Sequence, residues 1–402
     1  MKTRVWNNGI GDAVALLRGG GLVAVPTETV YGLACNGLDA AAVERLYEIK
    51  GRPAVKPLSL MVPDAKAIDA CCRDVPAAAR ELAKKFWPGP LTLVLPANGT
   101  VPTIVRAGGD TVGLRCPDHP LTLRLLREAG VPFAAPSANP SGEQSPKTAD
   151  EVLAYFNGRI EAVIDGGPCG IGTESTIVSL AETPYRILRE GALPAEEIAD
   201  ALVDGMTVIG VTGGSGGGKT TALCVLESLG ALVIDADAVY HELLERDGEL
   251  LRAIAARFPG TVSENGLDRK ALAKTVFSDA TALEALNGIT HPLVIEETRR
   301  RLRAHAMAGG TLAALDAVAL CESGLDTLCD ASFAVTAPRE ARIVRIMARD
   351  ALSREEAERR IDAQRSDDYY IRHCGSVLCN DADEASFTLR CRQKFLEVIN
   401  HG

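Results

Sequence analysis

Apolar residues along the chain fall into short runs whose spacing predicts a mixed α/β fold. In the first half, GLVAVPT (residues 21–27) and GPLTLVLP (residues 89–96) are bulky apolar runs bracketed by glycine and proline, a pattern typical of strands. DAAAVERLYEIKG predicts a helix with Asp39 as its N-cap and Gly51 near its C-cap. Strand-like and helix-like segments therefore mix within this half.

Two helix starts carry the spacing of a capping box, in which a hydroxyl residue and a glutamate three positions later satisfy each other's backbone N–H groups. Thr148 and Glu151 have this spacing in TADEVLAYF, and Ser353 and Glu356 have it in SREEAERRIDAQ. Both segments are therefore predicted to be helices that begin after the hydroxyl residue.

The organisation of the chain changes near residues 204–206, where a short predicted helix ends and TVIGVTG begins a new strand. From there strands and helices alternate, the pattern of a parallel sheet with helices on both faces. TLAALDAVAL, at residues 311–320, is predicted to be a buried strand of that sheet. Since 402 residues suffice for two cores, the sequence predicts two α/β domains, at residues 1–204 and 205–402.

Composition limits the kinds of partner and the cellular location expected for these domains. The formal net charge is −10, with −4 before Met206 (20 basic and 24 acidic residues) and −6 from Met206 onward (23 basic and 29 acidic). Neither half has the cation surplus of a nucleic-acid binder, so no stable nucleic-acid binding is expected. The 11 cysteines form no Cys-x-x-Cys pair, which favours reduced thiols. Because no apolar run or leader resembles a membrane span or signal peptide, we expect no membrane association and a cytoplasmic location.

The second half opens with a phosphate-binding motif. GGSGGGKT fits the pattern G-x-x-x-x-G-K-[ST] and lies between an apolar strand and a helix. Small residues let backbone N–H groups surround phosphate oxygens, Lys219 would reach the β- and γ-phosphates, and Thr220 would hold Mg²⁺. A merely flexible glycine-rich turn is the weaker alternative, because it explains neither Lys219 nor Thr220. The predicted ATP-binding residues of this loop are Gly213, Gly214, Ser215, Gly216, Gly217, Gly218, Lys219, Thr220 and Thr221.

A pair of carboxylates follows the next predicted strand, ALVIDAD. Asp235 and Asp237 come at its carboxyl end, the edge that faces the ligand in such sheets. An aspartate there can take the proton of an acceptor hydroxyl during phosphoryl transfer. Asp237 would also suit a helix N-cap, and the two roles are compatible.

From about Thr207 to the C-terminus the chain resembles dephospho-CoA kinase, through TGGSGGGKT, GALVIDADAVYHELLE, HPLV and ARDALSREEAERRIDAQ. The resemblance implies ATP-dependent phosphorylation of the ribose 3′-hydroxyl of dephospho-CoA. It implies a P-loop kinase fold with a parallel sheet and a helical lid, and Asp237 as the catalytic base. It further implies that Arg349 lies in the lid over the phosphates, Asn380 near the adenine, and Asp235, His291 and Asp316 on the dephospho-CoA side.

The second half departs from this family at two positions. Val318 stands where the family usually has a proline after the strand-end Asp316, and Ala382 stands where a glycine is usual. Both changes concern the acceptor and adenine contacts and leave the phosphate loop intact. For His291, helix capping or core packing weighs as much as a substrate role.

The first half has no phosphate-loop motif, yet its loops carry many cations, hydroxyls and amides. AVPTETVYGLA, EIKGRPAVKPLSL, VGLRCPDHP, APSANPSG, GTESTIV and RILREG each place such groups beside a strand or helix end. This set suits a polyphosphate and a small polar substrate. Because neither a Cys–His nor a Ser–His–Asp arrangement is evident, catalysis by positioning and charge neutralisation is favoured. Each cation alone could be a solvated helix-end charge, but several beside Pro/Gly-braced elements favour a site.

These motifs, from about Gly9 to Leu193, resemble the YrdC-like family of threonylcarbamoyl-AMP synthases, with a twisted mixed sheet and helices. The resemblance implies synthesis of L-threonylcarbamoyladenylate and diphosphate from L-threonine, bicarbonate and ATP, for threonylcarbamoyl-adenosine in tRNA. Lys50 and Arg52 are implied to be catalytic. The implied ATP-binding residues are Lys50, Arg52, Lys56, Thr111, Ser137, Asn139, Ser145 and Arg189. The implied threonine-binding residues are Thr29, Arg115, Ala135 and Ser175. Met61 departs from the histidine that many relatives have in the threonine pocket.

The sequence thus predicts a bifunctional enzyme that uses Mg²⁺ and ATP at two independent sites. A hand-off of the adenylate to tRNA threonylcarbamoyl transferase proteins would follow from the first activity. The main alternative is that the first half is an RNA-binding module and only the second half is catalytic, which its acidic balance disfavours. For the second half, the rival is another small-molecule P-loop kinase.

Overall fold

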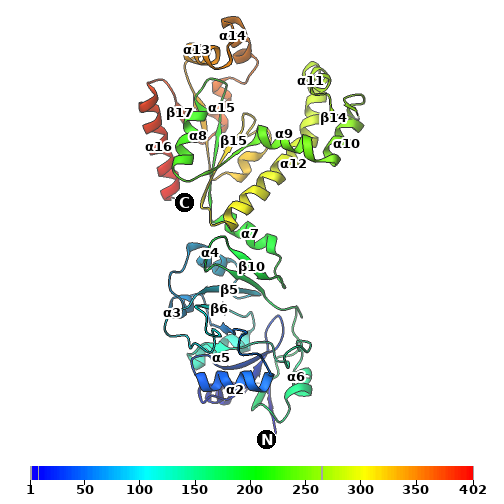
Figure 1. Cartoon of the computed structure of the whole chain (residues 1–402), viewed down its shortest axis with the longest axis vertical. Helices are drawn as coiled ribbons and strands as arrows, with labels where there is room; N and C mark the ends of the chain where they lie inside the picture. Colours follow the sequence, from blue (N-terminus) through cyan, green and yellow to red (C-terminus); the bar gives the residue numbers. More distant parts are fainter. Residues whose placement is uncertain (1, 8, 264–265, 402) are drawn as a thin grey trace. The chain divides into compact units, whose positions relative to one another are not determined.

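The structure is a computed structural model that describes residues 2–7, 9–263 and 266–401. It divides into two compact units, which we describe separately (Figure 1). The N-terminal unit comprises Met1–Gly205 with Met307–Gly309, and the C-terminal unit comprises Met206–Ala306 with Gly310–Gly402. Among the described residues, no helix is long and apolar enough to span a bilayer.

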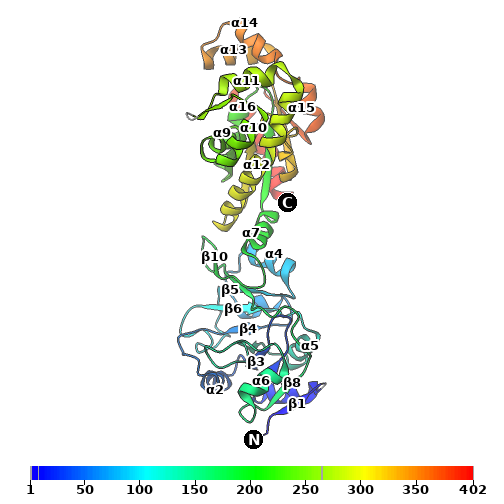
Figure 2. The ribbon, with the colours of Figure 1, turned by 90° about the vertical axis from the view of Figure 1, so that its right-hand side faces the viewer.

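The N-terminal unit is built on one mixed sheet of ten described strands, in the order β1-β8-β2-β3-β7-β4-β6-β5-β9-β10. Figure 2 shows β10, β5, β6, β4 and β3 stacked in this sequence. The strands are β1 (Arg4–Trp6), β2 (Val23–Val25), β3 (Gly32–Asn36), β4 (Ser59–Met61), β5 (Leu91–Pro96), β6 (Thr111–Arg115), β7 (Phe133–Ala134), β8 (Ala162–Ile164), β9 (Thr176–Ser179) and β10 (Arg186–Arg189).

The helices of this unit pack against the sheet and against one another. They are α1 (Ile10–Arg18), α2 (Ala40–Lys50), α3 (Ala67–Cys71), α4 (Ala77–Phe86), α5 (Pro120–Ala129), α6 (Ala149–Phe156) and α7 (Ala195–Asp204). α1 packs on α5, and their apolar faces bury Leu17 and Leu125 against Val25 and Phe133 of the sheet. Because burial of such side chains contributes about 1.5–3 kcal/mol each, this core fixes the strands that position the loops.

The predicted local signals of this unit are mostly confirmed. α2 begins at Asp39, whose carboxylate accepts the N–H groups of Ala41 and Ala42, and it ends at Gly51 with a left-handed φ of 59°. The predicted box at α6 is only half formed. Thr148 accepts the Glu151 N–H, but the Glu151 carboxylate accepts the N–H of Lys147 instead of that of Thr148.

The C-terminal unit contains a five-stranded parallel sheet in the order β12-β15-β11-β16-β17, as the alternation of elements predicts. Its strands are β11 (Thr207–Thr212), β12 (Leu232–Asp235), β15 (Leu312–Asp316), β16 (Ala331–Thr336) and β17 (Ser376–Cys379). Helices α8 (Lys219–Ser228) and α16 (Glu384–His401) lie side by side and bury Phe387 and Phe395 over this sheet (Figure 1). The α/β class predicted for both halves is therefore confirmed.

The strand predicted at residues 311–320 is shorter than expected. β15 ends at Asp316, and residues 317–320 leave the ladder in a turn. There the Thr212 hydroxyl donates to the Val318 carbonyl at 3.0 Å. Ala317 and Leu320 are nevertheless buried, so the apolar run marks burial and not strand length.

Two helical groups extend from this sheet. The first is α9 (Ala236–Arg246), α10 (Gly248–Arg257), α11 (Arg269–Ser278) and the long α12 (Ala280–Met307), with a small pair of strands, β13 (Val262–Ser263) and β14 (Gly266–Leu267). The second is α13 (Arg339–Asp350) and α14 (Arg354–Asp362), followed by α15 (Asp367–His373), while the short 3-10 helix η1 (Leu325–Leu328) contacts β11. α14 begins with the predicted capping box of Ser353 and Glu356, in which both bonds are present.

Candidate active sites

A polar cavity of about 390 Å³ lies in the N-terminal unit, lined from strands β3, β4, β5, β6, β9 and β10, from the end of α2 and from the loops around them. It brings together ten of the residues predicted from the sequence, Lys50, Arg52, Lys56, Arg115, Ala135, Ser137, Asn139, Ser145, Ser175 and Arg189. Thr29 lies behind the lining and bonds Arg115. Thr111 starts β6, at the opposite end of that strand from Arg115, so its nucleotide contact stays a prediction.

Lys50 is the most deeply buried cation of this cavity. It ends α2 with only 3% of its surface exposed, and its ammonium donates to the carbonyls of Ser137 and Asn139. Burial, and then the nearby Arg52, lower the Lys50 pKa from 10.5 to about 8, while Glu174 acts in the opposite direction. The lysine therefore joins α2 to the Ser137–Asn139 loop and holds a positive charge inside the cavity.

Arg115 is held in a fixed orientation at the end of β6. One guanidinium nitrogen donates to the Glu28 carboxylate and the Thr29 hydroxyl, each at 2.8 Å. Glu28 also accepts the backbone N–H of Asp118 at 3.0 Å. Because Arg115 and Glu28 are both largely buried, this ion pair fixes the guanidinium beside the cavity. Its Nε donates to the Gly89 carbonyl at 3.4 Å, so the second terminal nitrogen is the one that can bind a carboxylate.

A second arginine of the lining, Arg189, is anchored at the end of β10. It donates to the Ser175 carbonyl at 2.8 and 3.1 Å and pairs with the Glu174 carboxylate. Glu174 also accepts the Ser145 hydroxyl at 2.9 Å. The sequence reasoning selected Ser145, Ser175 and Arg189 but missed Glu174, because an acidic residue in GTESTIV gives no signal for an anion site.

One buried polar atom in the cavity lining has no partner among the described residues. The Asn139 amide nitrogen donates to the carbonyls of Pro140 and Glu143, whereas its side-chain oxygen accepts no hydrogen bond. An unpaired buried acceptor costs about 1–3 kcal/mol, so this atom is suited to a donor on a ligand. Met61 also lines the cavity, and its methyl group would lie 3.1 Å from a Cβ added at Gly32, so apolar surface closes this side.

The phosphate loop of the C-terminal unit joins β11 to α8. Gly213, Gly216 and Gly218 have φ values of 135°, 76° and 111°, which only glycine adopts freely. A Cβ at Gly213 would lie 2.2 Å from the Val335 carbonyl oxygen. Lys219 begins α8 and donates to the Gly213 carbonyl at 2.9 Å. The glycines are therefore required by backbone shape and by close packing, as the motif predicts.

Four side chains brace this loop from other elements. Arg342 donates to the Ser215 carbonyl at 2.9 Å, and Arg345 donates to the Gly216 carbonyl at 3.2 Å. Gln364 accepts the Ser215 N–H at 2.8 Å, while the Asn380 amide donates to the Gly217 carbonyl at 3.0 Å. Sequence reasoning named only Asn380 among these four. The three-residue spacing of the two arginines on one helix was the signal that could have found them.

Arg349, the lid residue predicted from the sequence, lies one turn further along α13. Its guanidinium pairs with the Asp350 carboxylate through two bonds of 2.8 Å, and it adds to the positive charge that acts on Lys219. Its contact with a phosphate stays a prediction, as does the adenine contact of Asn380, whose described side-chain bonds are to the phosphate loop and Arg345.

Carboxylates converge at the carboxyl edge of the sheet, as the strand pattern predicts. In register, Asp316 at the end of β15 is paired with Asp235 on β12 and Val211 on β11. Burial raises the pKa of Asp316 to about 6, with Lys219 opposing the shift. Burial and Asp235 also raise the pKa of Asp237, while burial lowers that of Lys219.

The two aspartates of ALVIDAD have different roles. Asp235 is the N-cap of α9 and accepts the N–H groups of Asp237 and Ala238 at 2.8 and 3.0 Å. The capping role considered for Asp237 is therefore wrong, because its neighbour performs it. In the described residues no hydrogen bond occupies the Asp237 carboxylate, which lines a cavity of about 420 Å³. A carboxylate with a raised pKa at such a position suits a general base.

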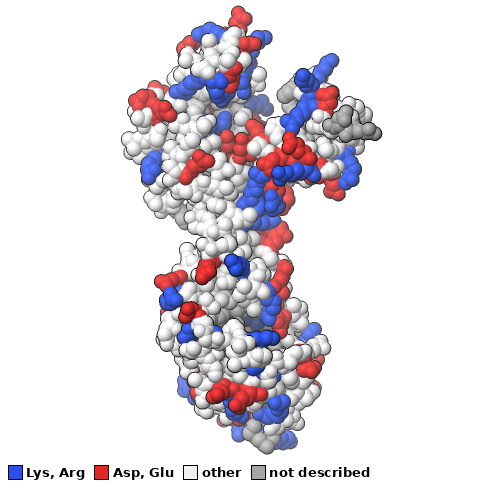
Figure 3. Space-filling model, viewed as in Figure 1, with Lys and Arg blue, Asp and Glu red and all other residues white. Residues whose placement is uncertain are grey.

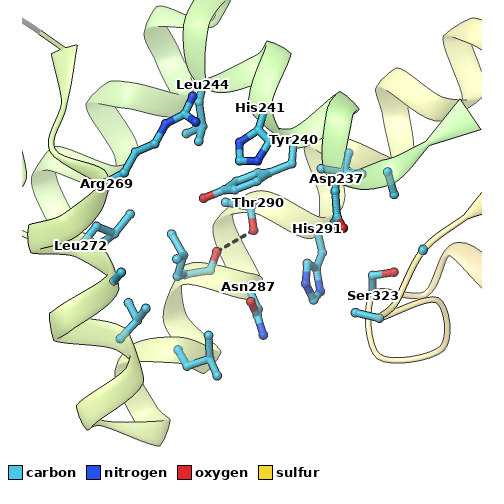
Figure 4. A pocket seen from close by; sticks show the side chains of 18 of the residues that line it. Asp237, Tyr240, His241, Leu244, Arg269, Leu272, Asn287, Thr290, His291 and Ser323 are labelled. Atoms are coloured by element: carbon cyan, nitrogen blue, oxygen red, sulfur yellow. Dashed lines mark hydrogen bonds between the residues drawn. The ribbon is translucent and has the colours of Figure 1, made fainter. Parts of the chain in front are cut away.

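This second cavity lies between α9, α11 and α12 (Figure 4). Asp237, His291 and Ser323 gather at one side of it, and Leu244 and Leu272 lie at the other. His291 lies inside α12, so the helix-capping alternative is wrong, and its ring faces the cavity. Burial lowers the His291 pKa, which favours a neutral imidazole that can exchange hydrogen bonds with a hydroxyl.

The oxygen groups near the phosphate loop fit a magnesium ion that arrives with a nucleotide. Mg²⁺ prefers hard oxygen ligands and usually takes only one or two from protein, the rest being water and phosphate. The Thr220 hydroxyl is exposed in the first turn of α8, and Asp316 supplies a carboxylate at the adjacent strand end. No cluster of three or more histidine, cysteine, aspartate or glutamate side chains that could hold a metal ion occurs in the described part of the chain.

Comparison with known proteins assigns the two halves separately. A family model described as telomere recombination (Sua5, YciO and YrdC) matches residues 15–191, and one described as dephospho-CoA kinase matches residues 207–386. The chain is 50% identical over 186 residues to a threonylcarbamoyl-AMP synthase of Pyrococcus abyssi, 46% of this chain and 55% of that protein.

Two further relatives are matched over nearly their whole length. A putative threonylcarbamoyl-AMP synthase of Mycobacterium tuberculosis is 37% identical over 205 residues, 51% of this chain and 94% of that protein. A dephospho-CoA kinase of Moorella thermoacetica is 39% identical over 199 residues, 49% of this chain and 94% of that protein. By contrast, the chain spans only about half the length of three threonylcarbamoyl-AMP synthases, those of Pyrococcus abyssi, Bacillus subtilis and Schizosaccharomyces pombe, at 55%, 55% and 49%.

Proposed function

Because the chain belongs to the threonylcarbamoyl-AMP synthase family through its first half and to the dephospho-CoA kinase family through its second, we propose that it is a bifunctional enzyme. The N-terminal unit would form L-threonylcarbamoyladenylate and diphosphate from L-threonine, bicarbonate and ATP. The C-terminal unit would phosphorylate the ribose 3′-hydroxyl of dephospho-CoA with ATP.

The observation that carries the first activity is the buried polar cavity around Lys50. The threonine amine and bicarbonate give a carbamate and water, and the carbamate oxygen then attacks the α-phosphorus of ATP while diphosphate leaves. Arg115, oriented by Glu28, would bind the threonine carboxylate. Lys50, Arg52 and Arg189 would neutralise the polyphosphate, so that charge stabilisation and positioning supply the catalysis.

The observation that supports the second activity is that one unit contains both a braced phosphate loop and the Asp237 carboxylate, which has no hydrogen bond among the described residues. Lys219 and the loop N–H groups would hold the β- and γ-phosphates. Asp237 would accept the proton of the 3′-hydroxyl while the hydroxyl oxygen forms a bond to the γ-phosphorus of ATP and ADP leaves. When bound, Mg²⁺ would neutralise phosphate charge, held by Thr220 and Asp316.

One incubation series tests both activities. Purified chain and ATP are mixed with threonine plus bicarbonate in one tube and with dephospho-CoA in another, and the adenylate and ADP are measured separately. Lys219→Ala should abolish ADP formation and leave the adenylate unchanged, and Arg52→Ala should do the reverse. Asp237→Asn should lower kinase turnover without comparable loss of ATP binding. A folded variant among these that loses both activities would contradict two independent sites.

An RNA-binding role for the N-terminal unit is the weaker candidate. On the face shown in Figure 3, basic and acidic side chains are interspersed, without the basic stripe that binding to an RNA backbone requires.

A product used in tRNA modification would still require hand-off to a transferase protein. We place both reactions in the cytoplasm, and cell fractionation would test this location.

A further inference from the structure

We propose that Arg269 selects the acceptor of the C-terminal site by binding the 5′-diphosphate of the acceptor nucleotide. The inference rests on the kinase function proposed above. It adds a residue for substrate choice that is separate from both the phosphate loop and the general base.

The lining of the acceptor cavity points to Arg269. Among the described residues of this lining, Arg269 is the only lysine or arginine. The reactive end contains Asp237, His291 and Ser323, and the remaining walls are mostly apolar, from residues such as Leu272 and Val276. A bound diphosphate would need a cation within this lining, because two negative charges leave water at a large cost when they are unpaired.

The placement of the side chains defines an order along the cavity. Figure 4 shows the Tyr240 ring between Asp237 and Arg269, with its hydroxyl directed to the Arg269 side. Burial raises the Tyr240 pKa and the Arg269 guanidinium opposes that rise, which agrees with their proximity. A nucleoside with its 3′-hydroxyl at Asp237 could therefore lie along the Tyr240 ring with its 5′-phosphates at Arg269.

Arg269 is available for such a ligand. Its one described ion pair is to Glu245 at 3.5 Å, with side chains 53% and 70% exposed, and pairs of this kind contribute little. The first N–H groups of α11, at Lys270 and Ala271, are already bonded to Asp268. Recognition would therefore come from the guanidinium, which can bind two phosphate oxygens at once.

The chemistry of the acceptor fits this order. In dephospho-CoA the diphosphate joins the adenosine to the pantetheine arm. With the diphosphate at Arg269, the pantetheine arm would continue toward the apolar wall of the cavity. Leu244 of α9 and Leu272 and Val276 of α11 form this wall. Adenosine carries the same base and 3′-hydroxyl but neither the diphosphate nor the arm, so it reports on the reactive end alone.

The test compares the two acceptors in the full chain by ADP release. Arg269→Ala should lower kcat/KM for dephospho-CoA about ten- to hundredfold, the range for a lost charged hydrogen bond, mainly through KM. kcat/KM for adenosine and the KM for ATP should stay within about twofold. Arg269→Lys should recover part of the loss. Arg252→Ala, which removes a 76% exposed arginine outside the cavity lining, should match the unaltered chain.

The outcomes separate this inference from the proposed function. If the unaltered chain does not phosphorylate dephospho-CoA, the proposed function fails. If it does, and Arg269→Ala leaves dephospho-CoA unaffected or weakens both acceptors equally, the role of Arg269 is overturned. Should the alanine variant fail to fold, Arg269→Gln, which retains most of the stem, carries the same comparison with the same contradicting results.

Discussion

Replacing Lys50 by methionine would isolate the energetic effect of one buried charge. Lys50 is 3% exposed, and its ammonium bonds only backbone carbonyls in the described structure, those of Ser137 and Asn139. Methionine keeps much of the stem and removes both the charge and the donor. Loss of the donor leaves two carbonyls without this partner, a cost of about 1–3 kcal/mol each that does not vary with pH.

The charge of Lys50 makes the free energy of unfolding depend on pH, and the direction of this dependence follows from its lowered pKa. The Lys50 pKa falls from 10.5 in the unfolded chain to about 8 in the folded protein, and this shift corresponds to about 3 kcal/mol. Below pH 8 both states hold the proton, so the folded state bears the full cost of burying it. Between pH 8 and 10.5 the unfolded state binds more protons, so the free energy of unfolding rises with pH. The methionine variant lacks this rise.

Tryptophan fluorescence during urea unfolding measures the effect in the intact chain. The chain has two tryptophans, Trp6 and Trp87, and both lie in the N-terminal unit. The stability difference between the lysine and methionine proteins should be constant below pH 8 and should grow by about 3 kcal/mol in favour of lysine up to pH 10.5. Lys84→Met, which removes an 81% exposed lysine, should follow the unaltered protein. A difference that does not change with pH would refute a depressed Lys50 pKa.

Three further expectations concern the neighbours of the two sites. Glu174→Gln removes a charge that raises the Lys50 pKa, so the pH profile of adenylate synthesis should lose its alkaline side at lower pH; an unmoved profile would argue against this coupling. Kinase turnover should fall as the pH drops through about 6, because the raised pKa of Asp316 causes it to protonate there, and full activity at pH 5 would contradict a need for its carboxylate. Arg345→Ala frees the Gly216 carbonyl and should raise the KM for ATP about three- to tenfold with the acceptor KM unchanged, as measured by steady-state kinetics.

Local sequence signals predicted the elements that depend on neighbouring residues. The glycines of the phosphate loop, the Asp39 cap and the box at Ser353 were all found from spacing alone, because each rests on backbone geometry within a few positions. Asp235 was found because parallel strands bring their carboxyl ends to one edge, whereas Asp316 was named only through the resemblance to dephospho-CoA kinase. The Thr148 box was only half right, since the carboxylate of a capping glutamate can reach a different backbone N–H.

Contacts between distant segments could not be predicted in this way. Gln364 and Arg342 reach Ser215 across more than a hundred positions, and no local pattern encodes such a separation. Asp237 showed the reverse error, because its spacing suited a cap that Asp235 provides. Side-chain partners at long range depend on the packing of whole elements, which a single sequence leaves open.

The two proposed sites differ in the groups that would bind phosphate, and this difference explains which residues the sequence reasoning missed. Under the proposed function the C-terminal site would bind phosphate through backbone N–H groups, and its extra residues are braces such as Arg345, which donates to the Gly216 carbonyl. The N-terminal site would bind phosphate through side-chain cations, and cations held close together repel one another. Its extra residues are therefore carboxylates, with Glu28 paired to Arg115 and Glu174 to Arg189. A search for cations finds such a site but overlooks the acids that pair with two of its three predicted arginines, whereas Arg52 instead donates to the carbonyls of Lys56 and Pro57.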